Sequence, residues 1–235
     1  MEPLRRPPIG FAHRGARAHA PENTLESFRL AQRLGANGLE SDVWLSEDGV
    51  AVLDHDGVVR SGTRKRPIGA ILRAKLPEHI PTLAELYEAC GTDFELSLDV
   101  KDPAALPAVL AVAREAGGDA ISRLWLCHHD WELVASWRPV DGDVSLVDST
   151  RLKRIKEGPE RRAASLAEAG IDAVNLHQTD WSGGLTTLFH RFKRLAFGWD
   201  AQYPRVLEAL LAMGIDAVYS DHVDRMVDAL QKFDR

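Results

Sequence analysis

Acidic side chains with a spacing of two residues lie near the ends of predicted strands in this 235-residue sequence. Glu40 and Asp42 share one face of their strand, because successive side chains of a strand point to opposite sides. Asp99 and Lys101 repeat this spacing on a later strand, with the apolar Val100 between them facing the other way. The pattern indicates polar faces that look into one shared site rather than solvated loops.

Two interpretations fit these acids. Glu40, Asp42 and Asp99 offer only oxygen atoms, which a hard divalent cation prefers, and they would leave open positions for water and substrate. In the other interpretation the carboxylates form structural ion pairs with Arg14 and Lys101. A zinc hydrolase is not expected, because no His-x-His pair ends the first predicted strand.

The stretch AHRGARAHAPENTLESF, residues 12–28, begins in that first strand and enters a helical pattern. His13 and Arg14 in it are either solvated residues of a turn or half of a catalytic site. Asn23 is predicted to cap the helix, with Glu26 three residues later as its partner in a capping box.

Eight short apolar runs, each followed by a helical pattern, would position these residues. The runs lie at residues 9–15, 37–45, 94–101, 122–129, 144–148, 171–177, 194–199 and 215–221. Strand–helix alternation favours a parallel sheet, and eight units in a chain of this length predict a TIM (β/α)8 barrel. An open, doubly wound sheet is the alternative, which the absence of an early Gly-x-Gly-x-x-Gly disfavours.

A barrel places its chemistry at the carboxyl ends of the strands. Besides the residues already named, polar or aromatic side chains end several other runs: His128, His129, Asp148, His177, Trp199 and Asp221. Between the second and third barrel strands, the Asp48-Gly49 turn signal predicts a β-hairpin. Residues 57–80 then read as a short irregular insertion, so that residues 1–235 are expected to form a single barrel domain.

Composition excludes several classes of protein. The net charge of −6 opposes binding to nucleic acid or anionic membranes, so the basic residues at 64–66 and 151–162 are interpreted as solvated surface. No apolar run of about 18 residues predicts a membrane span, and the first residues lack the apolar core of a signal peptide. Cys90 and Cys127 form no recognisable disulfide framework, which suits a reducing compartment. We therefore expect a cytoplasmic protein.

The chain resembles the glycerophosphodiester phosphodiesterase family over roughly residues 9–228. The resemblance is carried by segments in matching order: AHRG, PENT, GLESDVWLSEDG, VAVLDHD, IPTLAEL, LSLDVK, FGWDAQ and GIDAVYSD. It implies a TIM barrel, one bound Mg²⁺ or Ca²⁺, and hydrolysis of a small glycerophosphodiester to glycerol 3-phosphate and an alcohol. It also implies roles for individual residues: His13 and His55 as the catalytic pair, Glu40, Asp42 and Asp99 as metal ligands, Arg14 and Lys101 as phosphate contacts, and Trp199 as a wall of the substrate pocket.

These residue types suit the implied reaction. A phosphodiester anion repels nucleophiles, so a cation and basic side chains must neutralise its oxygens, while two histidines can serve as acid and base near neutral pH. The sequence departs from the family at Asp99, where a glutamate is usual, and at Asp200 and Gln202, which follow Trp199. The short insertion at 57–80 is the expected source of substrate selectivity. Two alternatives stay open: a related phosphodiesterase that acts on lysophospholipids, or a non-catalytic phosphodiester-binding barrel.

Overall fold

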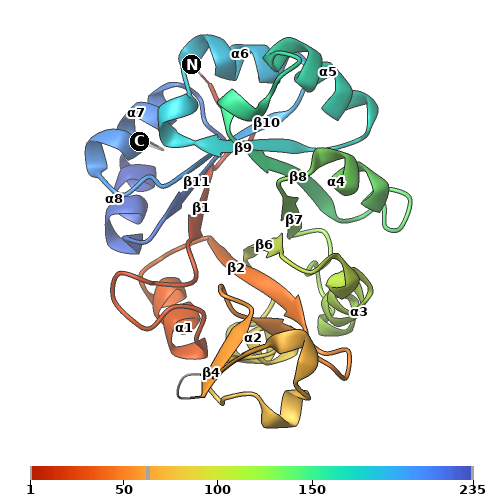
Figure 1. The fold of residues 1–235 in the computed structure, drawn as a ribbon. Coiled ribbons are helices and arrows are strands. Elements are labelled where there is room, and N and C mark those ends of the chain that lie inside the picture. The colour runs from red at the N-terminus through yellow and green to blue at the C-terminus, as the bar shows by residue number, and fades with distance from the viewer. Residues whose placement is uncertain (1, 62–63, 234–235) are drawn as a thin grey trace.

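The structure is a computed structural model that describes residues 2–61 and 64–233. Within these residues eight parallel strands form a closed ring, and helices surround it (Figure 1). The ring closes where β1 (Ile9–Ala12) pairs with both β2 (Gly38–Leu45) and β11 (Ala217–Ser220). The strands between them are β6 (Glu95–Val100), β7 (Leu124–His128), β8 (Ser145–Thr150), β9 (Ala173–His177) and β10 (Leu195–Trp199). The predicted TIM barrel is therefore confirmed.

Each barrel strand leads to a helix, as the alternating pattern predicts. The helices are α1 (Leu25–Arg33), α2 (Leu83–Cys90), α3 (Leu106–Ala116), α4 (Trp131–Trp137), α5 (Pro159–Glu168), α6 (Gly183–Arg191), α7 (Pro204–Ala212) and α8 (Val223–Phe233). None of these helices is long and apolar enough to cross a membrane. Single turns of 3-10 helix lie at Ile68–Ala70, Arg73–Lys75, Pro103–Ala105, Leu152–Arg154 and Gln178–Asp180.

The cap of α1 differs from the prediction. Thr24, not Asn23, is the N-cap, and its side chain accepts a hydrogen bond from the Ser27 N–H. Asn23 instead has a positive φ of 54° and accepts a hydrogen bond of 2.7 Å from the Ser41 hydroxyl. Both residue types can cap a helix. The Asn23 side chain is instead engaged by Ser41 of β2, and α1 begins one residue later than a cap at Asn23 would require.

The hairpin after β2 is confirmed, since β3 (Ala51–Leu53) pairs with it in antiparallel fashion. The insertion is more regular than expected: β4 (Val58–Ser61) and β5 (Arg64–Pro67) form a second antiparallel pair. Residues 62–63 of this insertion lie outside the described residues. Because β5 is exposed along its whole length, it carries no apolar alternation that would have predicted a strand.

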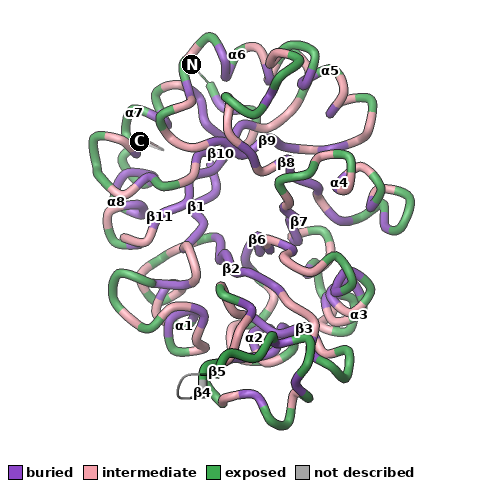
Figure 2. Tube along the Cα trace, viewed as in Figure 1, coloured by how far each residue is buried: buried purple, intermediate pink, exposed green. Residues whose placement is uncertain are grey.

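Buried residues follow the barrel strands (Figure 2), and they form two main core layers and a small third cluster around Val52 and Ile68 of the hairpin and insertion. Large side chains, including Phe11, Trp125, Phe197 and Tyr219, fill the barrel interior. A larger layer lies between the strands and the helices and contains the outward-facing side chains of β6, as its sequence pattern predicts.

The amino ends of the strands are covered by the segment before β1. The Arg5 guanidinium donates a hydrogen bond of 2.6 Å to Glu95 at the start of β6, and Glu95 also accepts one of 2.7 Å from the Trp125 indole. The Arg5 backbone N–H donates to Asp216, just before β11. These contacts close one end of the barrel, which leaves the carboxyl ends of the strands as the open mouth.

Candidate active site

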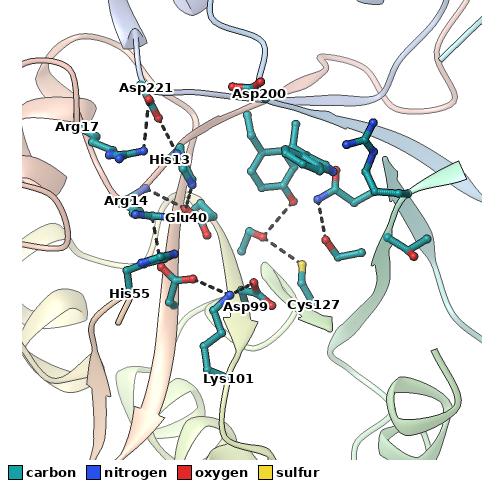
Figure 3. Close-up of a pocket in the computed structure, with 18 of the residues that line it drawn as sticks. His13, Arg14, Arg17, Glu40, His55, Asp99, Lys101, Cys127, Asp200 and Asp221 are labelled. Atoms are coloured by element: carbon teal, nitrogen blue, oxygen red, sulfur yellow. Dashed lines mark hydrogen bonds and ion pairs between the residues drawn. The ribbon is translucent and has the colours of Figure 1, made fainter. Parts of the chain in front are cut away.

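A cavity of about 560 Å³ lies at the carboxyl ends of the barrel strands. All eight side chains singled out in the sequence line it: His13, Arg14, Glu40, Asp42, His55, Asp99, Lys101 and Trp199. Figure 3 shows that they reach the cavity from several strands and loops. The fold thus brings the predicted residues together in the one place where a TIM barrel carries out chemistry.

The acidic residues lie side by side on β2 and β6. The parallel register places Asp42 next to Asp99, and Glu40 and Asp42 are 6% and 3% exposed. Burial is the main reason that the pKa of Glu40 rises to about 7; His13 opposes this rise, and Asp42 adds to it. Burial and the neighbouring acids therefore disfavour the ionised form of Glu40 more than His13 and the Arg14 N–H favour it.

Lys101 extends between two of the acids (Figure 3). Its Nζ lies 2.5 Å from Asp99 Oδ2 and 3.1 Å from Asp42 Oδ1. Burial alone would lower the pKa of Lys101, but the two carboxylates outweigh that effect and raise it. The ion pairs considered from the sequence are thus present, and they involve the same acids that the metal interpretation uses.

The donor set nevertheless fits a hard cation. Glu40, Asp42 and Asp99 supply oxygen atoms only, and Asp42 Oδ2 is buried without a hydrogen-bond partner among the described residues. In the part of the chain that the structure describes, these three acids do not each bring an oxygen within 4.8 Å of the others. Coordination by all three would therefore require rotation of side chains and movement of Lys101 from between the acids.

A different group does meet that distance criterion. His19, His222 and Asp224 place one ligand atom each within 4.8 Å of one another. His19 is paired with Asp224 at 3.1 Å, and none of the three lines the cavity.

Asp221 holds the His13 ring at its Nδ1 atom. Its Nδ1 lies 2.6 Å from Asp221 Oδ1, and its Nε2 lies 3.9 Å from Glu40 Oε2. An ionised carboxylate can only accept a hydrogen bond, so Nδ1 carries a proton and donates this hydrogen bond to Asp221, while Nε2 is on the side of Glu40. Burial alone would lower the pKa of His13, but Glu40 and Asp221 raise it above its usual value.

Arg14 has a left-handed backbone conformation and contacts two of the acids, Glu40 and Asp42. With φ at 52°, its N–H donates a hydrogen bond of 2.9 Å to Glu40 Oε2, while its guanidinium Nε lies 3.5 Å from Asp42 Oδ2. Gly15 follows with φ at 79°, and a Cβ there would lie 2.4 Å from a side-chain atom of α1. Only glycine fits this turn, which explains the His-Arg-Gly triplet at the exit of β1.

His55 reaches the cavity from the loop after β3. Its Nδ1 lies 2.9 Å from Asp56 Oδ1, and this hydrogen bond lowers the pKa of Asp56. The loop turns at Gly57, whose N–H donates to Asp54 and whose Cβ, if present, would lie 2.4 Å from the Trp44 ring. His13 and His55 therefore enter the same cavity from separate segments.

The opposite wall comes from the ends of β8, β9 and β10. Trp199 is contacted edge-on by His177, with ring centroids 4.5 Å apart, and the Arg151 guanidinium lies 5.6 Å from its ring centre. Asp200, with a positive φ of 64°, pairs with His177 at 3.1 Å. Trp199 is thus held in place by neighbours on two sides.

Some of the predicted strand-end residues do not reach the cavity. Asp148 is fully buried between β8 and α5, where it pairs with Arg162 at 2.7 Å, because its side chain points outward from the barrel. The His128 and His129 rings contact each other, with centroids 4.3 Å apart, and neither lines the cavity.

The basic run at 151–162 also differs from its interpretation as solvated surface. Arg162 is buried in its ion pair with Asp148, and three residues of the same run line the cavity: Arg151, Lys153 and Arg154. Arg151, Lys153 and Arg154 lie in or beside the turn after β8, whereas Arg162 lies on the buried face of α5. A count of charges along the sequence cannot reveal this difference.

Two functional candidates were missed. Asp221 was recognised only as a strand end, although closure of a barrel places the last strand beside the first and hence beside His13. Asn175 lines the cavity from β9, and its position two residues before His177 on the same strand face was the available signal.

Comparison with known proteins gives one consistent result. The sequence model of the glycerophosphoryl diester phosphodiesterase family matches residues 13–225. A glycerophosphodiester phosphodiesterase of Caldanaerobacter subterraneus is 37% identical over 107 residues, which span 39% of this chain and 44% of that enzyme. Human glycerophosphodiester phosphodiesterase 1 is 38% identical over 109 residues, or 39% of this chain and 33% of the relative. The matched part therefore spans less than half of each of these relatives.

Solved structures agree over nearly the whole chain. The crystal structure of a glycerophosphodiester phosphodiesterase from Thermotoga maritima superposes with a TM-score of 0.80 at 25% identity, covering 94% of this chain and 97% of that one. A phosphodiesterase of Oleispira antarctica, solved with the product sn-glycerol-3-phosphate, has the same fold with a TM-score of 0.83 at 22% identity, covering 95% and 97% of the two chains.

Proposed function

Because the chain belongs to the glycerophosphoryl diester phosphodiesterase family, we propose that it hydrolyses glycerophosphodiesters to glycerol 3-phosphate and an alcohol. The observation that carries the proposal is one cavity lined by His13, His55 and three carboxylates, with Arg14 and Lys101 beside them. Acid, base and charge-neutralising groups then surround the space that a phosphodiester would occupy.

We assign Glu40, Asp42 and Asp99 as the ligands of one Mg²⁺ or Ca²⁺. Two features support this assignment: the donors are all oxygen atoms, and Asp42 Oδ2 is buried without a hydrogen-bond partner among the described residues, with only the longer 3.5 Å contact to Arg14. When bound, such an ion would neutralise the non-bridging oxygens of the phosphate. Arg14 supplies positive charge from the chain itself, and Lys101 becomes a phosphate contact once it leaves the carboxylates.

His13 and His55 then share the proton transfers. With its proton on Nδ1, held by Asp221 at 2.6 Å, His13 presents the free Nε2 as the base that accepts a proton from the attacking hydroxyl. His55 donates a proton to the oxygen of the departing alcohol. The attacking hydroxyl is that of the neighbouring glycerol carbon, which gives a cyclic phosphate that water then opens. Trp199 packs against the substrate from the opposite wall.

The decisive test is release of glycerol 3-phosphate from a panel of glycerophosphodiesters, with chelator, with Mg²⁺ and with Ca²⁺. A lysophospholipid is included, since hydrolysis of that compound alone would favour the related phosphodiesterase instead. The His13→Ala variant controls for contaminating activity. Absence of product from every glycerophosphodiester with both metals would contradict the proposal.

A further inference from the structure

We infer that the wall formed by the ends of β8, β9 and β10 binds the alcohol group of the substrate and selects an alcohol that carries hydroxyl groups and its own negative charge. This inference rests on the proposed function and adds the class of substrate. It follows from three features of that wall: uncompensated positive charge, a tryptophan face already occupied by a cation, and a buried acceptor without a partner.

The positive charge comes from the turn after β8. Lys153 and Arg154 line the cavity and are exposed, and within residues 2–61 and 64–233 neither has an ion-pair partner. Arg151, in the same turn, is held at 2.7 Å by Asp180 and is therefore largely neutralised. Lys153 and Arg154 thus face the cavity with their positive charge available to an anionic group.

The aromatic side of the wall is unsuited to a cationic alcohol. A quaternary ammonium group is usually bound against the face of a tryptophan, and the Arg151 guanidinium lies 5.6 Å from the ring centre of Trp199. A choline group would have to displace this guanidinium, which Asp180 holds at 2.7 Å, because the guanidinium already occupies a place against the ring. Asp200 is the acid on this wall, but His177 and Gln202 bond its two oxygens at 3.1 and 3.2 Å.

The third feature is Asn175. The residue is 5% exposed and lines the cavity; its Nδ2 donates to Ser149 at 3.2 Å, whereas its Oδ1 is buried without a hydrogen-bond partner among the described residues. A buried acceptor without a donor is costly, so this oxygen suits a hydroxyl group of the ligand.

The two walls divide the substrate between them. The glycerol hydroxyl that attacks phosphorus must reach His13, so the glycerol arm lies on the side of the carboxylates (Figure 3). The alcohol arm begins at the oxygen that His55 protonates and from there extends across the cavity to Asn175 and the turn after β8. A polyol that ends in a phosphate or carboxylate would satisfy both features of that wall.

Three substrates of matched core test the inference: glycerophosphocholine, glycerophosphoglycerol, and glycerophosphoglycerol with a terminal phosphate on the alcohol arm. We expect kcat/KM to rise from the first to the third, with about a tenfold span that shrinks as salt is added. Lys153→Glu/Arg154→Glu should reduce kcat/KM for the substrate with the terminal phosphate at least fivefold more than for glycerophosphoglycerol, whose alcohol arm is uncharged. Asn175→Ala should raise KM for the two polyol substrates more than for the choline substrate.

The control is Arg161→Glu/Arg191→Glu, which makes the same change in charge at exposed positions outside the cavity. Its substrate ranking should equal that of the wild type. A wild-type preference for the choline substrate, or an equal loss on all three substrates in the Lys153→Glu/Arg154→Glu variant, would overturn the inference while leaving the proposed function intact. Failure to release glycerol 3-phosphate from any of the three would remove the proposed function and this inference with it.

Discussion

The two histidines of the cavity are supported differently. The His13 side chain is 28% exposed and pairs with Asp221, whereas the His55 side chain is 39% exposed and pairs with the adjacent Asp56. We expect His13→Ala and His55→Ala each to lower kcat by about 100-fold or more, since each removes a proton-transfer group. Both variants should remain folded by circular dichroism. Near wild-type kcat in either one would exclude that histidine as acid or base.

Asp221 is expected to set the tautomer and the pKa of His13. Burial alone would lower that pKa, and Glu40 together with the Asp221 hydrogen bond raises it. Asp221→Asn removes one raising contribution, so the base stays neutral down to a lower pH. The acidic limb of the kcat/KM profile should move to lower pH, while plateau kcat falls by about tenfold or more because the ring loses its orientation.

The matched control for this pH profile is Asp224→Asn, which removes a carboxylate that pairs with His19 outside the cavity. Its profile should follow the wild type. A profile of Asp221→Asn with the acidic limb unmoved would mean that Asp221 supports the fold and not the base.

Asp99 distinguishes metal coordination from a structural ion pair. As a ligand, Asp99→Asn should leave the enzyme nearly inactive at low metal, because one full negative charge is lost from the cation. Asp99→Glu restores the residue usual in the family and should be partly active, since the longer side chain shifts the carboxylate. A metal titration of activity measures this. If Asp99 serves only to pair with Lys101 at 2.5 Å, the variants will differ in stability but share one half-saturation point.

At the scale of elements, the periodicity of the sequence was sufficient to locate the barrel and its open end. Side-chain parity on the strands and the family resemblance together indicated eight site residues, and all eight line one cavity. The cap of α1 was misplaced because Asn23 and Thr24 are adjacent and both can cap. The β4–β5 pair was missed because its exposed residues lack an apolar face. The bond between Asn23 and Ser41 joins segments that are distant in the sequence, which a local pattern does not contain, whereas the β4–β5 pair is local but has no apolar pattern to reveal it.

The run at 151–162 shows the same limit more sharply. Its charges looked alike in the sequence, yet Arg162 is buried against Asp148 and Lys153 faces the cavity. Burial raises the pKa of Asp148 to about 6, and Arg162 opposes this rise. The distinction arises because Arg162 lies on the buried face of α5, whereas Lys153 lies in the 3-10 turn Leu152–Arg154 after β8.

A variant that breaks the buried pair between Asp148 of β8 and Arg162 of α5 should have a stability that depends strongly on pH. Arg162→Met leaves the Asp148 carboxylate without its partner, at a cost of about 3–5 kcal/mol in the free energy of unfolding. The pKa of folded Asp148 is about 6 even with Arg162 opposing the rise, and loss of Arg162 raises it further, so the variant loses stability as pH rises from about 4, the pKa in the unfolded chain, to beyond 6. Urea unfolding at pH 5 and pH 8 should show the larger deficit at pH 8.

The double variant Asp148→Leu/Arg162→Met is the control for this experiment, because it removes both charges and should recover most of the lost stability. An Arg162→Met variant with the same deficit at both pH values would show that lost packing, not the unpaired carboxylate, causes it.

At the scale of the whole molecule, the cation should act as a stabilising ligand. An ion that binds only the folded chain raises its melting temperature, and the rise continues with the logarithm of the ion concentration once that concentration exceeds Kd. We expect Mg²⁺ or Ca²⁺ to raise Tm in the wild type and in His19→Ala, and to have no such effect in Glu40→Gln/Asp42→Asn. Differential scanning calorimetry with chelator as the baseline measures this. A shift that disappears in His19→Ala instead would place the bound ion at His19, His222 and Asp224.

The pairing of β1 with β11 also bears on how the protein is made. His13 is synthesised near the start of the chain and its partner Asp221 follows 208 residues later. A nascent chain that already contains both histidines and all three carboxylates still lacks the strand that closes the ring and the carboxylate that orients His13. Until that strand leaves the ribosome, the free edges of β1 and β10 remain open to pairing with other chains. Hydrolytic competence and protection from aggregation should therefore arise together, when β11 becomes available to pair with β1.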